Sequence, residues 1–236
     1  MSECDAFEEG HGLTSLHGSF VTEDLTDLSA LVATLRLSKK YDMARFRGQC
    51  VAQLKNEFPT TLREFDELDG WSYIAPGPDE DDTLSSVVNL AREVGLYSIL
   101  PLAFHAIGSP GETGCATELS PSDQIRRLEG HLRVLELPES TTMRWLLPGH
   151  LPGLACLRPE QCKATQGKRS AEIMLKIFDR PSFLDHWKAA WGEGLCKQCV
   201  TAAKNVYRAE RAKCWEKLPS LFGFPDWEEL KKMDFE

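Results

Sequence analysis

The sequence predicts an all-α fold, and three observations support this. Apolar residues recur at spacings of three and four along several segments, which is typical of helices with one buried face. Capping residues mark where several of these segments begin or end. No segment shows a persuasive strand-like alternation. With 236 residues, 42% of them hydrophobic, the chain can bury a core in one large domain or two small ones.

Four regions are expected from the composition. Residues 1–20 are rich in Gly, Ser, His and acids without periodicity, and should be mobile. Residues 21–69 should form a first helical part, and residues 70–82 an acidic loop or linker. Residues 83–236 should form a larger helical region.

The first helical part contains two short amphipathic helices joined at Tyr41–Asp42. Before the joint, four apolar residues fall at i, i+3, i+4 and i+7: Leu28, Leu31, Val32 and Leu35. After it, a second apolar face is formed by Phe46, Cys50, Val51 and Leu54. A short helix capped by Thr60 or Thr61 should follow within residues 60–69.

The linker is predicted from Pro76-Gly77-Pro78 and the acidic run 79–82, which is interpreted as a solvated loop and not a magnesium site. Thr83 should then cap a helix with one apolar face, ending at Gly95. A second helix around 97–107 should place Pro101 in its first turn. Residues 108–119 should form a second loop.

Further helices are expected downstream. Ser120 and Pro121 begin one whose apolar residues step by three and four: Ile125, Leu128, Leu132 and Leu135. Periodicity fades over 138–167, and helical patterns resume over 171–178, 183–191 and 196–218. The aromatic-rich tail, 221–230, should dock back on the helices.

Several of these motifs carry a resemblance to a known family. The stretch that ends at the joint between the first two helices is Leu35-Arg36-Leu37-Ser38-Lys39-Lys40-Tyr41-Asp42. It is followed by Phe46-Arg47 and Cys50. This resembles the closing helices of a BTB (POZ) domain. Three later fragments are similar to BTB-containing proteins of mushroom-forming fungi: Phe58-Pro59-Thr60-Thr61-Leu62, Leu90-Ala91-Arg92-Glu93-Val94-Gly95-Leu96, and the tail from Trp215 to Leu230. The strand-forming half of a BTB domain is missing before Leu28, so a truncated or shortened member is expected.

The resemblance implies a non-enzymatic interaction module or adaptor. Many BTB proteins homodimerise, and many present substrates to cullin-based ubiquitin ligases through the closing helices. A cullin or a second copy is therefore the expected partner. The surfaces expected to bind it comprise Arg36, Lys39, Lys40, Arg47, Phe222, Phe224 and Trp227.

The cysteines predict a metal site. Cys156 and Cys162 lie in the non-periodic stretch, and Cys196 and Cys199 form a C-x2-C pair at a helix start. Two such pairs can provide the four thiolates of a structural zinc site. The alternative is that the second pair packs in the core while the first is incidental. Cys214 or His186 could replace one ligand, although Cys214 lies too far along the helix to join Cys199 on one ion.

Other functions are disfavoured. No nucleophile elbow, phosphate-binding loop, H-E-x-x-H or dinucleotide fingerprint is present, so we expect no enzymatic activity. A net charge of −9 makes nucleic acid an improbable ligand. The alternatives are a zinc-stabilised regulatory or nucleic-acid-associated module with a basic face at Lys204, Arg208 and Arg211, or a degenerate BTB paralogue without a retained partner.

The sequence also predicts the cellular compartment of the protein. Charged residues interrupt every apolar run, so no membrane span is expected. The acidic N-terminus lacks the basic start and apolar run of a signal peptide. A cytoplasmic or nuclear protein with mostly reduced cysteines is therefore predicted.

Overall fold

The computed structural model describes residues 25–77, 79–107, 119–137, 142–177 and 183–235. These residues are predominantly helical, which confirms the all-α prediction. The expected mobile N-terminus, Cys4, Cys115 and nearly all of the loop predicted over 108–119 lie outside the described residues.

The first two helices form the predicted hairpin. Helices α1 (Leu28–Lys40) and α2 (Ala44–Glu57) are joined by a tight turn in which Asp42 adopts a φ of 50°. The Asp27 carboxylate caps α1 by accepting a hydrogen bond from the Ala30 N–H at 3.1 Å. Their facing sides bury Leu31, Leu35 and Leu54 completely or nearly so. The apolar spacing therefore predicted this pair correctly.

A two-stranded parallel sheet was not predicted. Strand β1 (Thr26–Asp27) pairs with β2 (Ile74–Ala75). Two residues per strand are too few to produce an alternating pattern in the sequence. The buried Glu57 carboxylate holds the second strand in place, because it accepts backbone N–H bonds from Tyr73 at 2.6 Å and Ile74 at 2.9 Å.

The next helices differ from the prediction at one boundary. Helix α3 (Leu62–Asp66) is capped by Thr61, one of the two candidate caps. Helix α4 (Glu80–Val94) begins three residues before the predicted cap, so the assignment of Thr83 as N-cap and of the whole acidic run to a loop was wrong. Asp79 performs the capping role by accepting from the Asp82 N–H at 3.1 Å. Acidic residues in a first turn are favoured by the helix dipole.

The following hairpin agrees with the prediction. Gly95 ends α4 with a φ of 78°, which a residue without a Cβ adopts readily. A 3-10 turn, η1 (Tyr97–Ile99), leads into α5 (Leu100–Ala106), with Pro101 in its first turn. Helix α6 (Pro121–Glu136) begins behind a Ser120 cap, as expected.

The C-terminal region contains two corrections. Helix α7 (Pro159–Ile177) begins well before the predicted residue 171, so Cys162 lies on a helix and not in a loop. Within 183–191, where a helix was predicted, the described residues form turns and the start of a 3-10 segment, η3 (Ala189–Gly192). A further 3-10 segment, η2 (Thr142–Leu146), lies in the stretch predicted to be irregular. Helices α8 (Lys197–Leu221) and α9 (Trp227–Met233) complete the fold.

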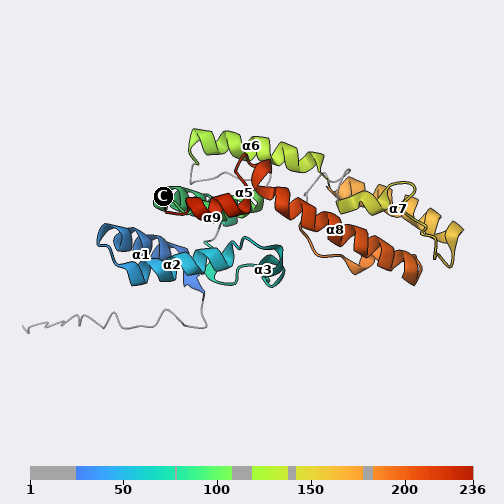
Figure 1. The fold of residues 1–236 in the computed structure, drawn as a ribbon, viewed down its shortest axis with the longest axis horizontal. Helices are drawn as coiled ribbons and strands as arrows, with labels where there is room; N and C mark the ends of the chain where they lie inside the picture. The colour runs from blue at the N-terminus through green and yellow to red at the C-terminus, as the bar shows by residue number, and fades with distance from the viewer. Residues whose placement is uncertain (1–24, 78, 108–118, 138–141, 178–182, 236) are drawn as a thin grey trace, which may run out of the picture.

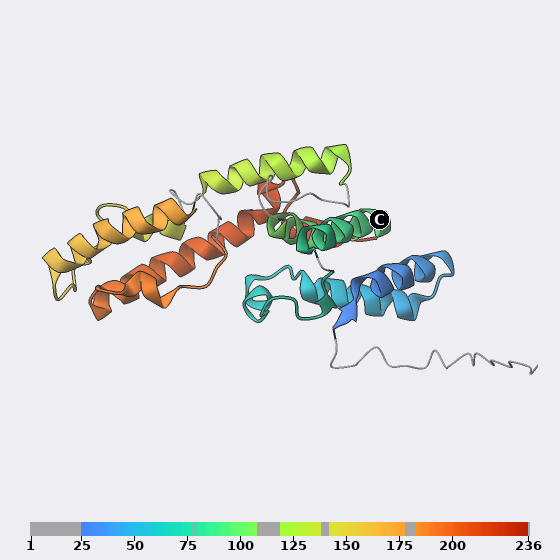
Figure 2. The ribbon, with the colours of Figure 1, turned by 180° about the vertical axis from the view of Figure 1, so that it is seen from behind.

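The helices gather around two hydrophobic cores. The larger core unites α1, α2, α4 and α5 with α9 and the C-terminal half of α8. The smaller core lies between η2, α7 and the N-terminal half of α8. Figures 1 and 2 show the resulting elongated shape, in which α8 runs from the larger body toward the end that carries α7.

Candidate metal centre

Four cysteines from three segments converge in the smaller core. Cys156 comes from the loop before α7 and Cys162 from the first turns of α7. Cys196 directly precedes α8, and Cys199 lies in its first turn. Their four Sγ atoms all lie within 4.8 Å of one another. These are the same four residues that the sequence predicted, and together they could hold a metal ion.

The spacing of the sulfurs suits a tetrahedral ion. A Zn–S bond is about 2.3 Å long, which places the sulfurs of a tetrahedral site about 3.8 Å apart. The Sγ atoms of Cys156 and Cys196 are 3.7 Å apart. A disulfide would require about 2.05 Å, so the described cysteines are free thiols.

The surrounding backbone positions the four thiols. Gln166 on α7 donates from Nε2 to the carbonyls of Trp145 at 3.1 Å and Leu147 at 2.9 Å, which ties α7 to the segment before the Cys156 loop. Gly194, with a φ of 83°, forms the turn that leads into α8. The Cys196 N–H then donates to the Cys162 Sγ at 3.3 Å.

The thiols differ in acidity. Burial raises the pKa of Cys199 to about 12 and also raises the pKa of Cys162. The backbone N–H groups of Cys199 and Leu157 point at the Cys196 sulfur and lower its pKa to about 6. The cluster therefore contains one thiol that ionises readily, whereas burial alone disfavours charge on two others. A bound cation would favour the ionised form of all four.

An aromatic cluster belongs to the same core as the cysteines. The ring of Trp187 contacts three other rings, with centroid-to-centroid distances of 5.1 Å to Trp145, 5.5 Å to Trp191 and 5.7 Å to Tyr207. Tryptophan emission should therefore respond to any change in this core.

The other candidate ligands lie elsewhere. Cys214 is fully buried in the larger core. His186 is largely exposed, with its Nε2 3.7 Å from an Asp66 oxygen. Neither residue belongs to the four-cysteine cluster.

The basic residues expected to bind a partner are mostly engaged within the chain. Arg36 forms a bidentate contact with Glu93, at 2.9 Å from Nε and 2.8 Å from Nη2, and Lys39 donates to the Glu93 carbonyl at 2.8 Å. Arg47 lies 3.3 Å from Asp42. Lys40 remains exposed, with its ammonium 5.4 Å from the Tyr41 ring centroid.

The aromatic tail is docked, as predicted. Phe222 and Trp227 are buried in the larger core and therefore lie inside the molecule, not on a binding surface. The Trp227 indole stacks on Trp215 with centroids 5.3 Å apart. Phe224 is partly buried, with its ring centroid 4.6 Å from the Arg126 guanidinium.

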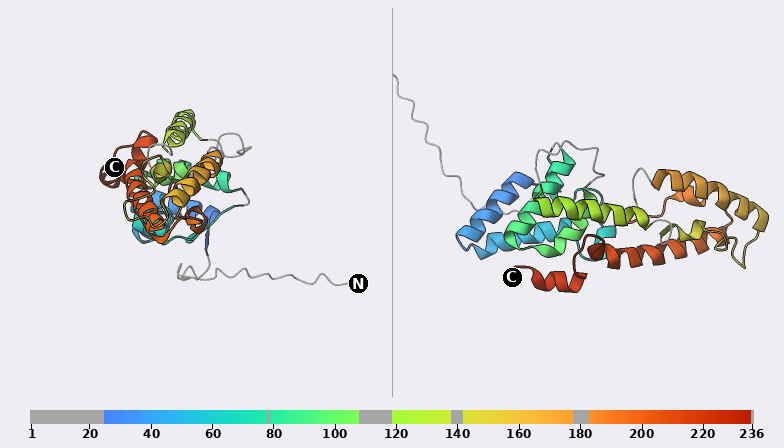
Figure 3. Two further views of the ribbon diagram at one scale, coloured as in Figure 1. Left: turned by 90° about the vertical axis from the view of Figure 1, so that its right-hand side faces the viewer. Right: turned by 90° about the horizontal axis from the view of Figure 1, so that it is seen from above.

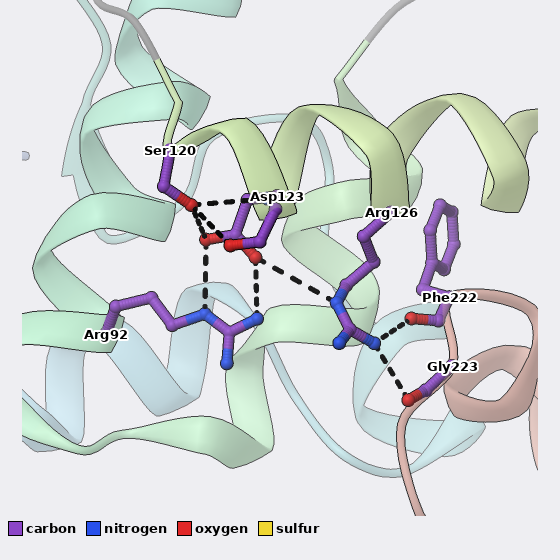
Figure 4. Close-up of polar contacts among 7 residues, drawn as sticks. Arg92, Ser120, Asp123, Arg126, Phe222 and Gly223 are labelled. Atoms are coloured by element: carbon purple, nitrogen blue, oxygen red, sulfur yellow. Dashed lines mark hydrogen bonds and ion pairs between the residues drawn. The ribbon is translucent and has the colours of Figure 1, made fainter.

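A polar network that sequence reasoning missed locks the tail to α4 and α6 (Figure 4). The buried Asp123 carboxylate accepts from Arg92 Nη2 at 2.6 Å and from the Ser120 hydroxyl at 3.0 Å. Arg126 donates to the carbonyls of Phe222 and Gly223. The only local signal was the position of Asp123 three residues after the Ser120 cap.

Two groups of exposed apolar residues were also missed as surface features. Leu37, Tyr41 and Met43 are exposed around the α1–α2 turn. Ile125, Leu128 and Leu132 are exposed along α6, at 58%, 46% and 61%. Their helical spacing predicted the element correctly, but it is equally typical of a buried face.

The predicted basic face on α8 is only partly available. Arg211 is buried, donates from Nε to the Leu184 carbonyl at 2.7 Å and pairs with Asp66. Lys204 is partly buried, and Arg208 is exposed. This weakens the case for nucleic-acid binding, because one of the three cations is buried and paired with Asp66 of the same chain.

Comparisons with known proteins found no matching family model, curated protein or solved structure. Within the described residues, no helix combines the length and apolar character needed to cross a bilayer. The fold and the site thus define a helical protein with a four-cysteine cluster able to bind a metal.

Proposed function

We propose that the cluster binds one structural zinc ion. The observation that carries this proposal is the convergence of four free thiols within 4.8 Å. Tetrahedral sites with four sulfur ligands are typical of zinc and of iron–sulfur proteins. Four thiolates occupy every position of a tetrahedral ion, which fits a structural role and not a catalytic one.

The proposed ion would add a direct link between the Cys156 loop, α7 and α8. The Cys156 loop lies between a short 3-10 segment and α7, and the exposed Leu154 and Leu157 flank the cysteine without contributing to the core. A metal bond from Cys156 to α7 and α8 would provide the order that apolar packing does not. Zinc would therefore stabilise this end of the molecule.

We further propose that the protein is a non-enzymatic interaction module, with cullin as the candidate partner that its BTB-like closing helices suggest. The supporting observation is the turn between α1 and α2, at which Leu37, Tyr41 and Met43 are exposed together with Lys40. Exposed apolar residues grouped in this way often mark a protein-binding site.

Elemental analysis of the purified chain, with thiol titration before and after chelation, tests the zinc site. We expect one zinc per chain and four thiols that react only after chelation. Cys199→Ser should lose the metal, whereas Cys50→Ser, which changes a buried cysteine outside the cluster, should retain it. A folded protein without zinc, in which the number of reactive thiols is the same before and after chelation, would contradict the proposal.

A pull-down with purified fungal cullin tests the interaction module. Leu37→Asp should reduce capture at least about tenfold, because a charge would disrupt an apolar contact centre. Tyr73→Ala is the matched control, since Tyr73 is also exposed but lies away from the α1–α2 turn. Equal capture by both variants, or no capture by the unaltered protein, would exclude this surface as a cullin site.

A further inference from the structure

Helix α6 has two different faces. Its inner face contains Asp123, Gly130 and Val134, all buried against the rest of the chain. Gly130 lies so close to the Phe222 ring that an added Cβ would fall 2.1 Å from it. The helix is therefore held firmly from one side.

The outer face is apolar. Ile125, Leu128 and Leu132 are exposed, and Leu135 is half-buried. These four residues follow one another at intervals of three, four and three. This is the a/d spacing of two heptads, the pattern that forms the seam of a two-stranded coiled coil. An ordinary solvated face would carry polar residues at these positions.

The position of α6 leaves this face accessible. Figure 1 shows α6 along the upper edge of the molecule, and the end-on view in Figure 3 shows it standing outward from the other helices. No other described segment covers Ile125, Leu128 or Leu132, as their exposed fractions show.

We propose that this face binds α6 of a second copy of the chain, forming a parallel two-helix seam. The same four residues are available on both copies, so they can pair about a two-fold axis and form a closed dimer. The charges also permit it. Between Pro121 and Glu136, three arginines balance Asp123, Glu129 and Glu136, so the helix is neutral in a chain of net charge −9. Electrostatic repulsion between the two copies is therefore small at this face.

The residues beside the seam favour the parallel arrangement. In a parallel pair, Gln124 faces Glu129 of the second copy, and His131 faces Glu136 of the second copy, so no like charges meet. In an antiparallel pair, Glu129 would face Glu136 of the second copy, and like charges would repel. Avoidance of this Glu–Glu contact thus favours the parallel orientation.

The contact is short. A helix of 16 residues is about 24 Å long at 1.5 Å per residue, and it presents only two heptads. We therefore expect a reversible dimer whose population rises with protein concentration. This inference goes beyond the proposed zinc and adaptor functions and depends on neither of them.

Sedimentation equilibrium of the full chain over a range of concentrations tests the proposal. The mass should rise toward twice that of one chain. Leu132→Lys should remain monomeric over the same range, with an unchanged helical circular dichroism spectrum, because residue 132 is exposed. Tyr73→Lys is the matched control and should associate like the unaltered protein, since Tyr73 is also exposed but lies outside α6 and the α1–α2 turn.

A second variant tests the orientation. Gln124→Lys places a cation opposite Glu129 in the parallel dimer and should tighten association by about threefold. In an antiparallel dimer the same lysine would face His131 and gain nothing. A monomer at every concentration, a dimer that survives Leu132→Lys, or association of Gln124→Lys no tighter than that of the unaltered protein would each overturn the proposal.

Discussion

His105 is a mostly buried titratable residue that takes no part in the cysteine cluster. Its ring lies 4.8 Å from that of Phe183, centroid to centroid. Burial lowers the pKa of His105 to about 4, and the charge of Asp185 offsets only part of that effect. The folded protein therefore favours the neutral imidazole, whereas the unfolded chain binds a proton below its ordinary pKa of 6.5.

This difference predicts a pH-dependent stability. Because the folded pKa is depressed, stability is fully present above about pH 6.5 and falls as the pH decreases toward 4. Between pH 7 and pH 5, His105 should contribute a loss of about 2 kcal/mol in the free energy of unfolding. Urea denaturation at the two pH values measures it. His105→Phe should reduce the pH-dependent loss by that amount, and an unchanged loss would refute the assignment.

Two helical glycines should respond in opposite ways to alanine. At Gly130, a Cβ would meet the Phe222 ring at 2.1 Å, so Gly130→Ala should destabilise the fold by about 1–3 kcal/mol through overpacking. At Gly48 in α2, nothing lies within 4 Å, and alanine should stabilise the helix by about 0.5–1 kcal/mol. Thermal or urea unfolding of the two variants compares them directly. Equal effects would show that α6 is not packed closely on Phe222.

At the scale of elements, the joint between α4 and α6 depends on one carboxylate. The buried Asp123 carboxylate lies 2.6 Å from the Arg92 guanidinium. Arg126, on the same helix as Asp123, donates hydrogen bonds to the backbone carbonyls of the tail (Figure 4). This arrangement connects three segments that lie far apart in the sequence.

Asp123→Asn should therefore destabilise the fold by about 2 kcal/mol, because Arg92 would lose its charged acceptor in a partly buried site. Glu129→Gln is the control: it removes the exposed pair with Arg133 on the same helix and should change stability by at most about 0.5 kcal/mol. Chemical denaturation measures both. Similar values for the two variants would mean that the Asp123 network contributes no more than a surface ion pair.

At the scale of the whole molecule, the two hydrophobic cores are expected to respond differently to metal removal. The larger core is closed by many aliphatic side chains from α1, α2, α4 and α5. The smaller core contains three of the four clustered cysteines and depends on η2 and α7 packing against α8. Loss of zinc should therefore loosen the smaller core and leave the larger one intact.

Chelation of the purified protein tests this expectation. Tryptophan emission should shift to longer wavelength, because Trp145, Trp187 and Trp191 all lie in or against the smaller core. Backbone amides of α4 and α5 should keep their protection from hydrogen exchange, since these helices belong to the larger core. Loss of protection throughout the chain would show instead that the molecule unfolds as one unit.

Much of the candidate site could be predicted from residue type and local spacing. The four cysteines stand in two pairs within the chain, and only a limited set of chemistries uses thiols in that way. Their convergence depends on how α7 and α8 pack, which no local pattern determines. The early start of α7 was missed for a similar reason, because residues 159–170 carry few apolar side chains to reveal a helical period.

The sequence by itself determined the helical class, the α1–α2 hairpin, the cap at Ser120 and the end of α4 at Gly95, and it narrowed the cap of α3 to Thr60 or Thr61. Each depends on residues within a few positions of one another, so local physics is sufficient. Only the tertiary structure decided which apolar stripes are buried. The residues of α4 and those of α6 have the same periodicity, yet Val87 and Val88 are fully buried while Leu128 and Leu132 are exposed. Burial depends on which surfaces meet, and contacts such as Arg92 with Asp123 join residues whose distance in the sequence carries no signal.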